Sequence, residues 1–282
     1  MITLKAFTPF SVSLCSVAAF LLASCSGPEP AKEARDESHV VHWGYEAEDG
    51  PRKWASMSSE WSLCGAGLEQ SPIDLVNPSP IELPPVEIDT PSDQEVEVLN
   101  QKGVIDALDN GHTIQINTKS AEKMTVGDKT YALVQFHFHA PSEHSVDGRH
   151  FPMEAHFVHQ AEDGALAVVG VLIEEGAENP SLTPLWEKLP HAPGTPATVR
   201  VPPEFAEYLF SGEATGVYHY RGSLTTPPCS EGVSWYIRKT PTRLSKEQIA
   251  AFTATYDHNN RPVQALGDRT VHLDENPTLT ID

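Results

Sequence analysis

The chain has 282 residues, of which 39% are hydrophobic and 21% charged, and these fractions exclude a polytopic membrane protein and wholesale disorder. With 19 basic and 39 acidic residues its net charge is −20, which excludes electrostatic binding of a nucleic acid. The 18 glycines and 24 prolines favour turns and short strands over long helices. The 13 histidines are numerous enough to justify a search for a metal site.

Residues 1–24 predict an export signal. They hold a single charged side chain, Lys5, and the largely apolar run at 12–23 is shorter than the roughly 20 residues of a spanning helix. The run ends in Leu-Ala-Ser-Cys at 22–25, which resembles a bacterial lipoprotein box with Cys25 as the lipidated residue. The alternative is an ordinary cleaved signal followed by a chance cysteine.

Residues 25–39 predict a lipidated N-terminus and a flexible tether, because residues 26–38 have almost no apolar side chains. Residues 40–282 contain no internal repeat and no linker-like change of composition, so they predict one domain. We expect an exported, periplasmic protein whose sole link to a membrane is the lipid. Serine after the lipidated cysteine favours the outer membrane as a general rule for diderm lipoproteins.

Two cysteines, Cys64 and Cys229, remain beyond this segment. In an exported domain they most simply form one disulfide. The alternative is a pair of zinc-ligand thiolates, which is weaker because neither cysteine lies in a CxxC motif and the histidines offer a better site.

Alternation of apolar and polar residues predicts strands at 131–139, 153–159, 165–173 and 233–238. Asp147-Gly148, between the first two, is a hairpin-type turn signal. Helices are few: Ser245 and Gln248 form a capping box ahead of one, and a shorter one follows Ser181. The predicted fold class is mainly β with some α, a single domain built on a large, mostly antiparallel, twisted sheet with short peripheral helices.

Three histidines fall on two of these strands. Side chains at i and i+2 of a strand share a face, so Gln135, His137 and His139 point the same way. Glu154 and His156 share a face of the next predicted strand. Such histidines are more often structural than ligands when they are taken alone, and four others, His144, His150, His159 and His258, are interpreted as structural or surface residues.

Three neutral imidazoles without a fourth protein ligand describe an open tetrahedral zinc site. The ion would keep its full charge and lower the pKa of a bound water towards neutrality. Gln135 and Glu154, each two residues before a histidine on the same face, suit acceptors that orient imidazole N–H groups.

Eight short motifs follow in order along the chain: HWGY at 42–45, QSPIDL at 70–75, NGH at 110–112, QFHFH at 135–139, SEH at 142–144, EAHFVH at 154–159, GSLTTPPC at 222–229 and NRP at 260–262. With them the chain from about His42 to its end resembles an α-class carbonic anhydrase of the bacterial type. The resemblance implies reversible hydration of carbon dioxide to bicarbonate and a proton by zinc-bound hydroxide. The implied cofactor is Zn²⁺ and the partner is a small-molecule substrate.

The zinc ligands that the resemblance implies are His137, His139 and His156, and the residues that orient their rings are Gln135 and Glu154. Thr225 matches the hydroxyl that accepts a hydrogen bond from zinc-bound hydroxide, and Glu143 matches the carboxylate that orients it. His112 matches the proton shuttle, a role that suits its near-neutral unperturbed pKa.

Other positions match the walls of the family's active site. The proton path would include Tyr45, Asn110 and Gln115. The substrate pocket would include Val158, Val168, Leu224, Thr226, Val233 and Trp235. The resemblance also pairs Cys64 with Cys229 in a disulfide, and it implies cis peptide bonds before Pro72 and Pro228 and a possible homodimer.

Two alternatives remain open. A catalytically inactive, carbonic-anhydrase-like zinc-binding module typically lacks a ligand, whereas all three histidines, Glu143 and Thr225 are present here. A zinc-storage lipoprotein usually has histidine-rich runs, whereas these histidines are dispersed.

Overall fold

The computed structural model describes residues 41–89, 104–109, 111–117, 122–190, 192–194, 196–200, 216–277 and 279–281. All of them belong to one unit, which begins at Val41. The predicted export signal, Cys25, the tether and Asn110 lie outside the described residues. Within those ranges, no helix combines the length and the apolar character needed to cross a membrane.

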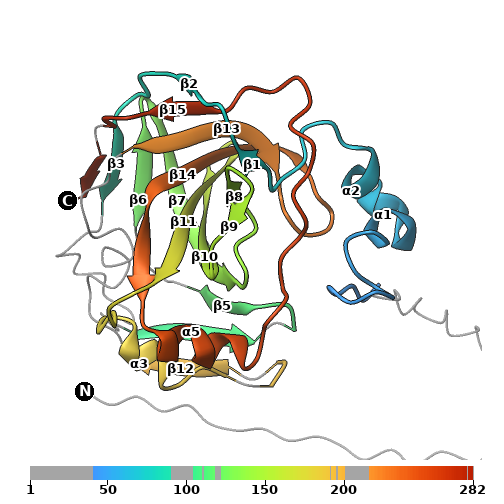
Figure 1. Ribbon diagram of the computed structural model, residues 1–282, viewed down its shortest axis with the longest axis vertical. Coiled ribbons are helices and arrows are strands. Elements are labelled where there is room, and N and C mark those ends of the chain that lie inside the picture. Colours follow the sequence, from blue (N-terminus) through green and yellow to red (C-terminus); the bar gives the residue numbers. More distant parts are fainter. Residues whose placement is uncertain are drawn as a thin grey trace, which may run out of the picture. The chain divides into compact units, whose positions relative to one another are not determined.

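Among the described residues, strands are far more extensive than helices (Figure 1). Their bounds are β1 Asp74–Leu75, β2 Ser79–Pro80, β3 Val86–Asp89, β4 Val104–Asp109, β5 Ile114–Asn117, β6 Lys123–Val126, β7 Lys129–His139, β8 Ser145–Val146, β9 Arg149–His150, β10 Met153–Ala161, β11 Leu166–Glu175, β12 Pro196–Arg200, β13 Val217–Ser223, β14 Glu231–Leu244, β15 His272–Asp274 and β16 Leu279–Ile281.

Thirteen of these strands form one sheet, whose main path runs β12-β4-β5-β7-β10-β11-β14-β13-β15-β2, with β6, β3 and β16 branching from β7. Most neighbours are antiparallel, and the parallel pairs in this sheet are β11 with β14, β15 with β2, and β16 with β3. Strands β1, β8 and β9 form a separate small sheet. The predicted fold class is therefore confirmed.

The four strands predicted from alternation are β7, β10, β11 and β14, which lie side by side at the centre of the sheet (Figure 1). The predicted turn forms the two-residue loop between β8 and β9, where Asp147 and Gly148 have φ of 50° and 77°. This small hairpin lies within the connection from β7 to β10. Both residues sit in the left-handed region, as a type I′ turn requires.

The central strands separate two faces. On β10, Met153, Ala155 and Phe157 enter the larger hydrophobic core, while Glu154 and His156 point to the opposite face. The larger core is completed by residues from two helices, α3 (Thr183–Trp186) and α5 (Lys246–Thr253). One side of the sheet therefore faces the larger core, and the other carries polar groups beside a second, smaller hydrophobic cluster.

Helix α5 has the predicted capping box: Ser245 Oγ accepts the Gln248 N–H at 3.2 Å, and the Gln248 side chain accepts the Ser245 N–H at 3.1 Å. Helix α3 matches the shorter helix expected after Ser181, and its Trp186 indole donates to the Gln248 carbonyl of α5. Three short helices were not predicted: α1 Trp54–Met57, η1 Ser59–Trp61 and α2 Leu63–Ala66.

A disulfide joins Cys64 of α2 to Cys229, 165 residues later. The buried Arg261 guanidinium donates to the carbonyls of Cys64 and Ser71 and to the Gln70 side chain. The bridge fixes α2 to the segment that follows β13, and this arginine ties α2 to the segment that follows α5. The peptide bonds before Pro72 and Pro228 are cis, as expected, and so is the bond before Pro141, which was not predicted.

Candidate metal centre and active site

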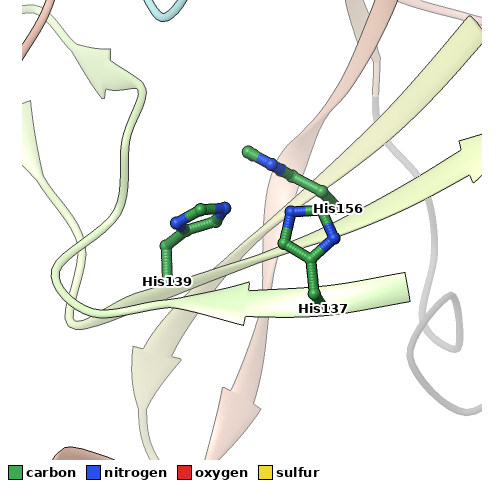
Figure 2. Close-up of side chains that lie close together, drawn as sticks. All are labelled: His137, His139 and His156. Atoms are coloured by element: carbon green, nitrogen blue, oxygen red, sulfur yellow. The ribbon is translucent and has the colours of Figure 1, made fainter. Parts of the chain in front are cut away.

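Three imidazoles converge on the polar face of the central strands (Figure 2). His137 and His139 come from β7, and His156 lies directly opposite His137 on β10. One ring nitrogen of each histidine lies within 4.8 Å of the corresponding nitrogens of the other two. The strand pairing therefore brings together the three residues that the sequence pattern singled out.

Two of the outer ring nitrogens contact the residues expected to orient them. His137 Nδ1 lies 2.8 Å from Gln135 Oε1, and His156 Nε2 lies 2.9 Å from Glu154 Oε1. A carboxylate or amide oxygen can only accept, so the outer nitrogen of each ring carries the hydrogen. The lone pairs of His137 and His156 are then left on the inner nitrogens.

The third ring is oriented by a group that the sequence analysis missed. His139 Nδ1 donates to the backbone carbonyl of Asn259 at 2.6 Å. A backbone carbonyl has no sequence signature, and this one lies 120 residues downstream. Among the described residues no hydrogen-bond partner reaches His139 Nε2, although the atom is buried. A cation at the point of convergence would satisfy this atom, and three imidazole nitrogens are a donor set that suits zinc.

Burial keeps these rings neutral. Desolvation lowers the pKa of His139 to about 4 and that of His156 below its usual value. For His137, burial together with the nearby charges of His139 and His156 places the pKa well below the usual value. At neutral pH all three lone pairs are available to a metal ion.

Glu154 is fully buried and accepts four hydrogen bonds. Its Oε1 contacts His156 and, at 2.7 Å, His144 Nδ1, while Oε2 accepts the backbone N–H groups of Glu143 and His144 at 2.9 Å each. Burial alone would raise the pKa of Glu154, but electrostatic interactions and hydrogen bonds with His144 and His156 lower it well below its usual value. The carboxylate therefore stays ionised behind His156.

Gly170 on β11 lies opposite His156 and makes room for this carboxylate. A Cβ at that position would stand 3.1 Å from Glu154 Oε1 and would overlap the Ile237 side chain. Nothing in the sequence pattern indicated this role, because a glycine inside a strand has several possible causes.

A second buried carboxylate, Glu143, faces the histidines. Its Oε1 accepts the Arg261 N–H at 2.8 Å, and its Oε2 lies 3.6 Å from His139 Nε2 and 3.8 Å from His156 Nδ1. Burial raises the pKa of Glu143 to about 6, against the lowering effects of His156, the Arg261 N–H and the Thr225 hydroxyl. The Thr225 hydroxyl, from the connection between β13 and β14, is therefore close enough to Glu143 to lower its pKa.

Apolar residues surround the polar groups on this face. The five predicted wall residues belong to one hydrophobic cluster, and the Trp235 ring stands edge-on to His156, with centroids 4.8 Å apart. Thr226 follows Thr225 in a turn that the Cys229 N–H closes by donating to the Thr226 carbonyl. The members of the wall are Val158, Val168, Leu224, Val233 and Trp235.

Three of the predicted proton-path residues, His112, Gln115 and Tyr45, lie among the described residues. Half-buried His112 stacks on Trp43, with ring centroids 3.6 Å apart and planes 6° apart. Gln115 lies opposite His137 on β5. Burial, and next the charge of Glu143, raise the pKa of Tyr45 well above its usual value, so Tyr45 stays protonated.

Comparison with known proteins agrees with this geometry. The family model described as eukaryotic-type carbonic anhydrase matches residues 49–275. The chain is 39% identical over 235 residues to a carbonic anhydrase of Pectobacterium atrosepticum, covering 83% of this chain and 91% of that one. It is 38% identical over 264 residues to a carbonic anhydrase of Neisseria gonorrhoeae, covering 93% and 98%.

The chain belongs to the eukaryotic-type carbonic anhydrase family. Among solved structures, the α-carbonic anhydrase of Thermovibrio ammonificans in complex with sulfanilamide superimposes with a TM-score of 0.73 at 40% identity. That match covers 82% of this chain and 99% of the other. The resemblance stated from the motifs is confirmed.

The four histidines that were set aside differ in their surroundings within this carbonic anhydrase fold. His150 and His258 are exposed, and His159 is buried. His144 is also fully buried, and its hydrogen bond to Glu154 links it directly to the candidate metal centre. Describing His144 as a structural or surface residue understated its place in the site.

The buried histidines predict that the metal-free protein loses stability in acid. Burial lowers the pKa of His139 and of His159 to about 4, whereas an unfolded histidine takes up a proton near pH 6.5. Between these values the unfolded chain binds more protons, so folding weakens as the pH falls. From pH 7 to pH 5 each histidine should remove about 2 kcal/mol from the free energy of unfolding, and Glu143, with its raised pKa, should restore about 1 kcal/mol.

Urea unfolding of the metal-free protein at the two pH values measures this difference. His159→Gln should reduce it by about 2 kcal/mol, whereas the exposed His258→Gln should leave it unchanged. An equal free energy of unfolding at pH 7 and pH 5 would contradict the assignment of neutral buried histidines.

Proposed function

We propose that this member of the carbonic anhydrase family interconverts carbon dioxide with bicarbonate and a proton, with one zinc ion held by His137, His139 and His156. The observation that carries the proposal is the convergence of three neutral imidazoles whose outer nitrogens are all engaged and whose inner nitrogens face one another. Zinc bound there would act as a Lewis acid and make hydroxide available at neutral pH. Gln135, Glu154 and the Asn259 carbonyl fix the rings for it.

Glu143 and Thr225 orient the nucleophile in this proposal. In this proposal the Thr225 hydroxyl donates to Glu143, so its oxygen is left as an acceptor. An acceptor at this place takes up the nucleophile's hydrogen and turns a lone pair towards the substrate, which is catalysis by positioning. The Arg261 N–H holds Glu143 in place for this role.

The apolar wall selects the substrate. Carbon dioxide has no net charge and packs against Val168, Val233 and Trp235, whereas bicarbonate is an anion that gains little there. Thr226 provides a second hydroxyl on the substrate side. The wall therefore favours entry of the substrate and release of the product.

His112 is proposed to carry the proton away. Its stacking on Trp43 leaves it half-buried, between the interior and bulk buffer. An imidazole of near-neutral pKa accepts and releases protons readily at physiological pH. Tyr45, Asn110 and Gln115 are proposed to line the path of ordered water that leads to it.

Removing one imidazole tests the metal centre. His137→Ala leaves two donors, so we expect the zinc content of residues 26–282 to fall well below one per chain and the hydration of carbon dioxide to be lost. Elemental analysis and stopped-flow hydration assays on the same sample measure both. His258→Ala, on an exposed side chain, should keep both properties.

Two results would contradict the proposal. One zinc per chain without hydration at any pH would indicate the inactive zinc-binding module, although all three histidines, Glu143 and Thr225 are present among the described residues. Metal content well above one per chain would indicate zinc storage.

Removing the Thr225 hydroxyl separates orientation from metal binding. In Thr225→Val we expect zinc to stay at one per chain and kcat/KM for hydration to fall about 100-fold, the usual cost of losing one catalytic hydrogen-bonding group. Thr253→Val, at a half-buried position near the end of α5, should change neither quantity. An unchanged kcat/KM in Thr225→Val would show that the hydroxyl does not orient the nucleophile.

We also propose that the protein is exported into the periplasm and held at the outer membrane by lipid on Cys25. The disulfide between Cys64 and Cys229 supports an oxidising compartment. Labelled fatty acid should enter the full-length chain expressed in a diderm bacterium and should not enter Cys25→Ser. Cys15→Ser should keep the label, and an unlabelled wild-type chain would instead indicate an ordinary cleaved signal.

A further inference from the structure

A buried chain of hydrogen bonds continues from Glu154 away from the metal centre. His144 Nδ1 lies 2.7 Å from Glu154 Oε1, and His144 Nε2 lies 2.6 Å from the Tyr220 hydroxyl. The Tyr220 hydroxyl lies 2.8 Å from Ser71 Oγ, which accepts the Ser223 N–H at 3.0 Å. These five side chains are at most 1% exposed, so water does not compete for their hydrogen bonds.

Only one assignment of donors and acceptors fits this chain of hydrogen bonds. Ionised Glu154 can only accept, so His144 Nδ1 donates and His144 Nε2 accepts. Tyr220 then donates its hydroxyl hydrogen to His144 and accepts from Ser71. Each hydroxyl donates once and accepts once, so every polar atom along the chain is used.

The end of this hydrogen-bond chain that is farther from Glu154 leads back to the active site. Ser223 Oγ accepts the Ser71 N–H at 2.9 Å and donates to the Leu224 carbonyl at 2.8 Å. Leu224 directly precedes Thr225. The hydrogen bonds therefore join a zinc-ligand partner on β10 to the start of the segment that carries the orienting hydroxyl.

The absence of a side chain at Gly222 leaves room for this chain of hydrogen bonds. A Cβ at Gly222 would overlap Ser71 Oγ, would stand 2.7 Å from the Tyr220 ring and would crowd the Trp235 ring at 3.0 Å. Any other residue would displace Ser71 from Tyr220. The backbone of β13 thus approaches closely at the point where the two hydroxyls meet.

We propose that His144 and Tyr220 are positioning residues of the metal centre, which act through Glu154 to hold His156 in its ligating orientation. The inference rests on the proposed zinc site. Glu154 sets the His144 tautomer, and the Tyr220 hydroxyl, which donates to Nε2, holds the ring so that Nδ1 stays aimed at Glu154 Oε1. Without the Tyr220 hydroxyl, the His144 ring loses this second anchor and is free to turn Nδ1 away from Glu154. Glu154 loses a restraint, and the His156 ring loses its fixed acceptor.

The test is the rate at which zinc leaves the full protein. Tyr220→Phe removes one oxygen atom, and we expect zinc transfer to an excess of chelator to be about tenfold faster, at the lower end of the effect of outer partners on metal affinity. Tyr218→Phe is the matched control: it lies two residues earlier on the same face of β13, and its hydroxyl takes no part in this chain. Its zinc release should match that of the wild type.

Unfolding of the metal-free variants in urea distinguishes positioning from a purely structural role. A structural role would lower the free energy of unfolding and leave the rate of zinc release unchanged, and this result would overturn the proposal. If Tyr220→Phe does not fold, Ser71→Ala removes the hydrogen bond that Tyr220 accepts, and a wild-type rate of release in that variant would also overturn it. A wild-type protein that does not retain one zinc per chain would instead refute the proposed function.

Discussion

One buried, ionised carboxylate holds this site together. Glu154 is withdrawn from water, which is costly for a charge unless hydrogen bonds replace the lost solvation. Four donors do so here: two imidazoles and two backbone N–H groups. Because one of those N–H groups belongs to Glu143, the same carboxylate orients a candidate zinc ligand and fixes the backbone of the residue that faces it. Displacing Glu154 would therefore disturb two parts of the site together.

The two faces of the sheet make this arrangement possible because each carries different side chains. Along β10, alternate residues enter the packed core, and the residues between them carry Glu154 and His156. The larger hydrophobic core stabilises the fold from one face, so the other face can hold polar groups that add little to the stability of the fold. Rigid strands also place imidazoles more exactly than a loop would, which matters for a centre that three side chains must share.

The parts of the fold and site that could be predicted are those encoded by local pattern. Alternation identified the four central strands, and spacing by two identified His137, His139, Gln135 and Glu154. Contacts made by backbone atoms left no such trace, so the Asn259 carbonyl was missed. The contacts of His144 were not predicted for a related reason: one of them is to Tyr220, 76 residues away, and that separation is set by the order of strands in the sheet. The other strands were not predicted because most are two to four residues long, which is too short to show a clear alternation of apolar and polar residues.

Several groups in the site disfavour folding when no metal ion is bound, and interactions elsewhere in the molecule offset their effect. Without a metal ion, buried histidines with lowered pKa values, a carboxyl with a raised pKa and an unsatisfied ring nitrogen at His139 lie within one small volume. Each opposes folding, because each is better solvated in the unfolded chain. The large core, the 165-residue disulfide loop and the Arg261 hydrogen bonds offset this cost. A bound cation would satisfy the inner nitrogens of the three histidines, so metal binding and folding are expected to reinforce each other.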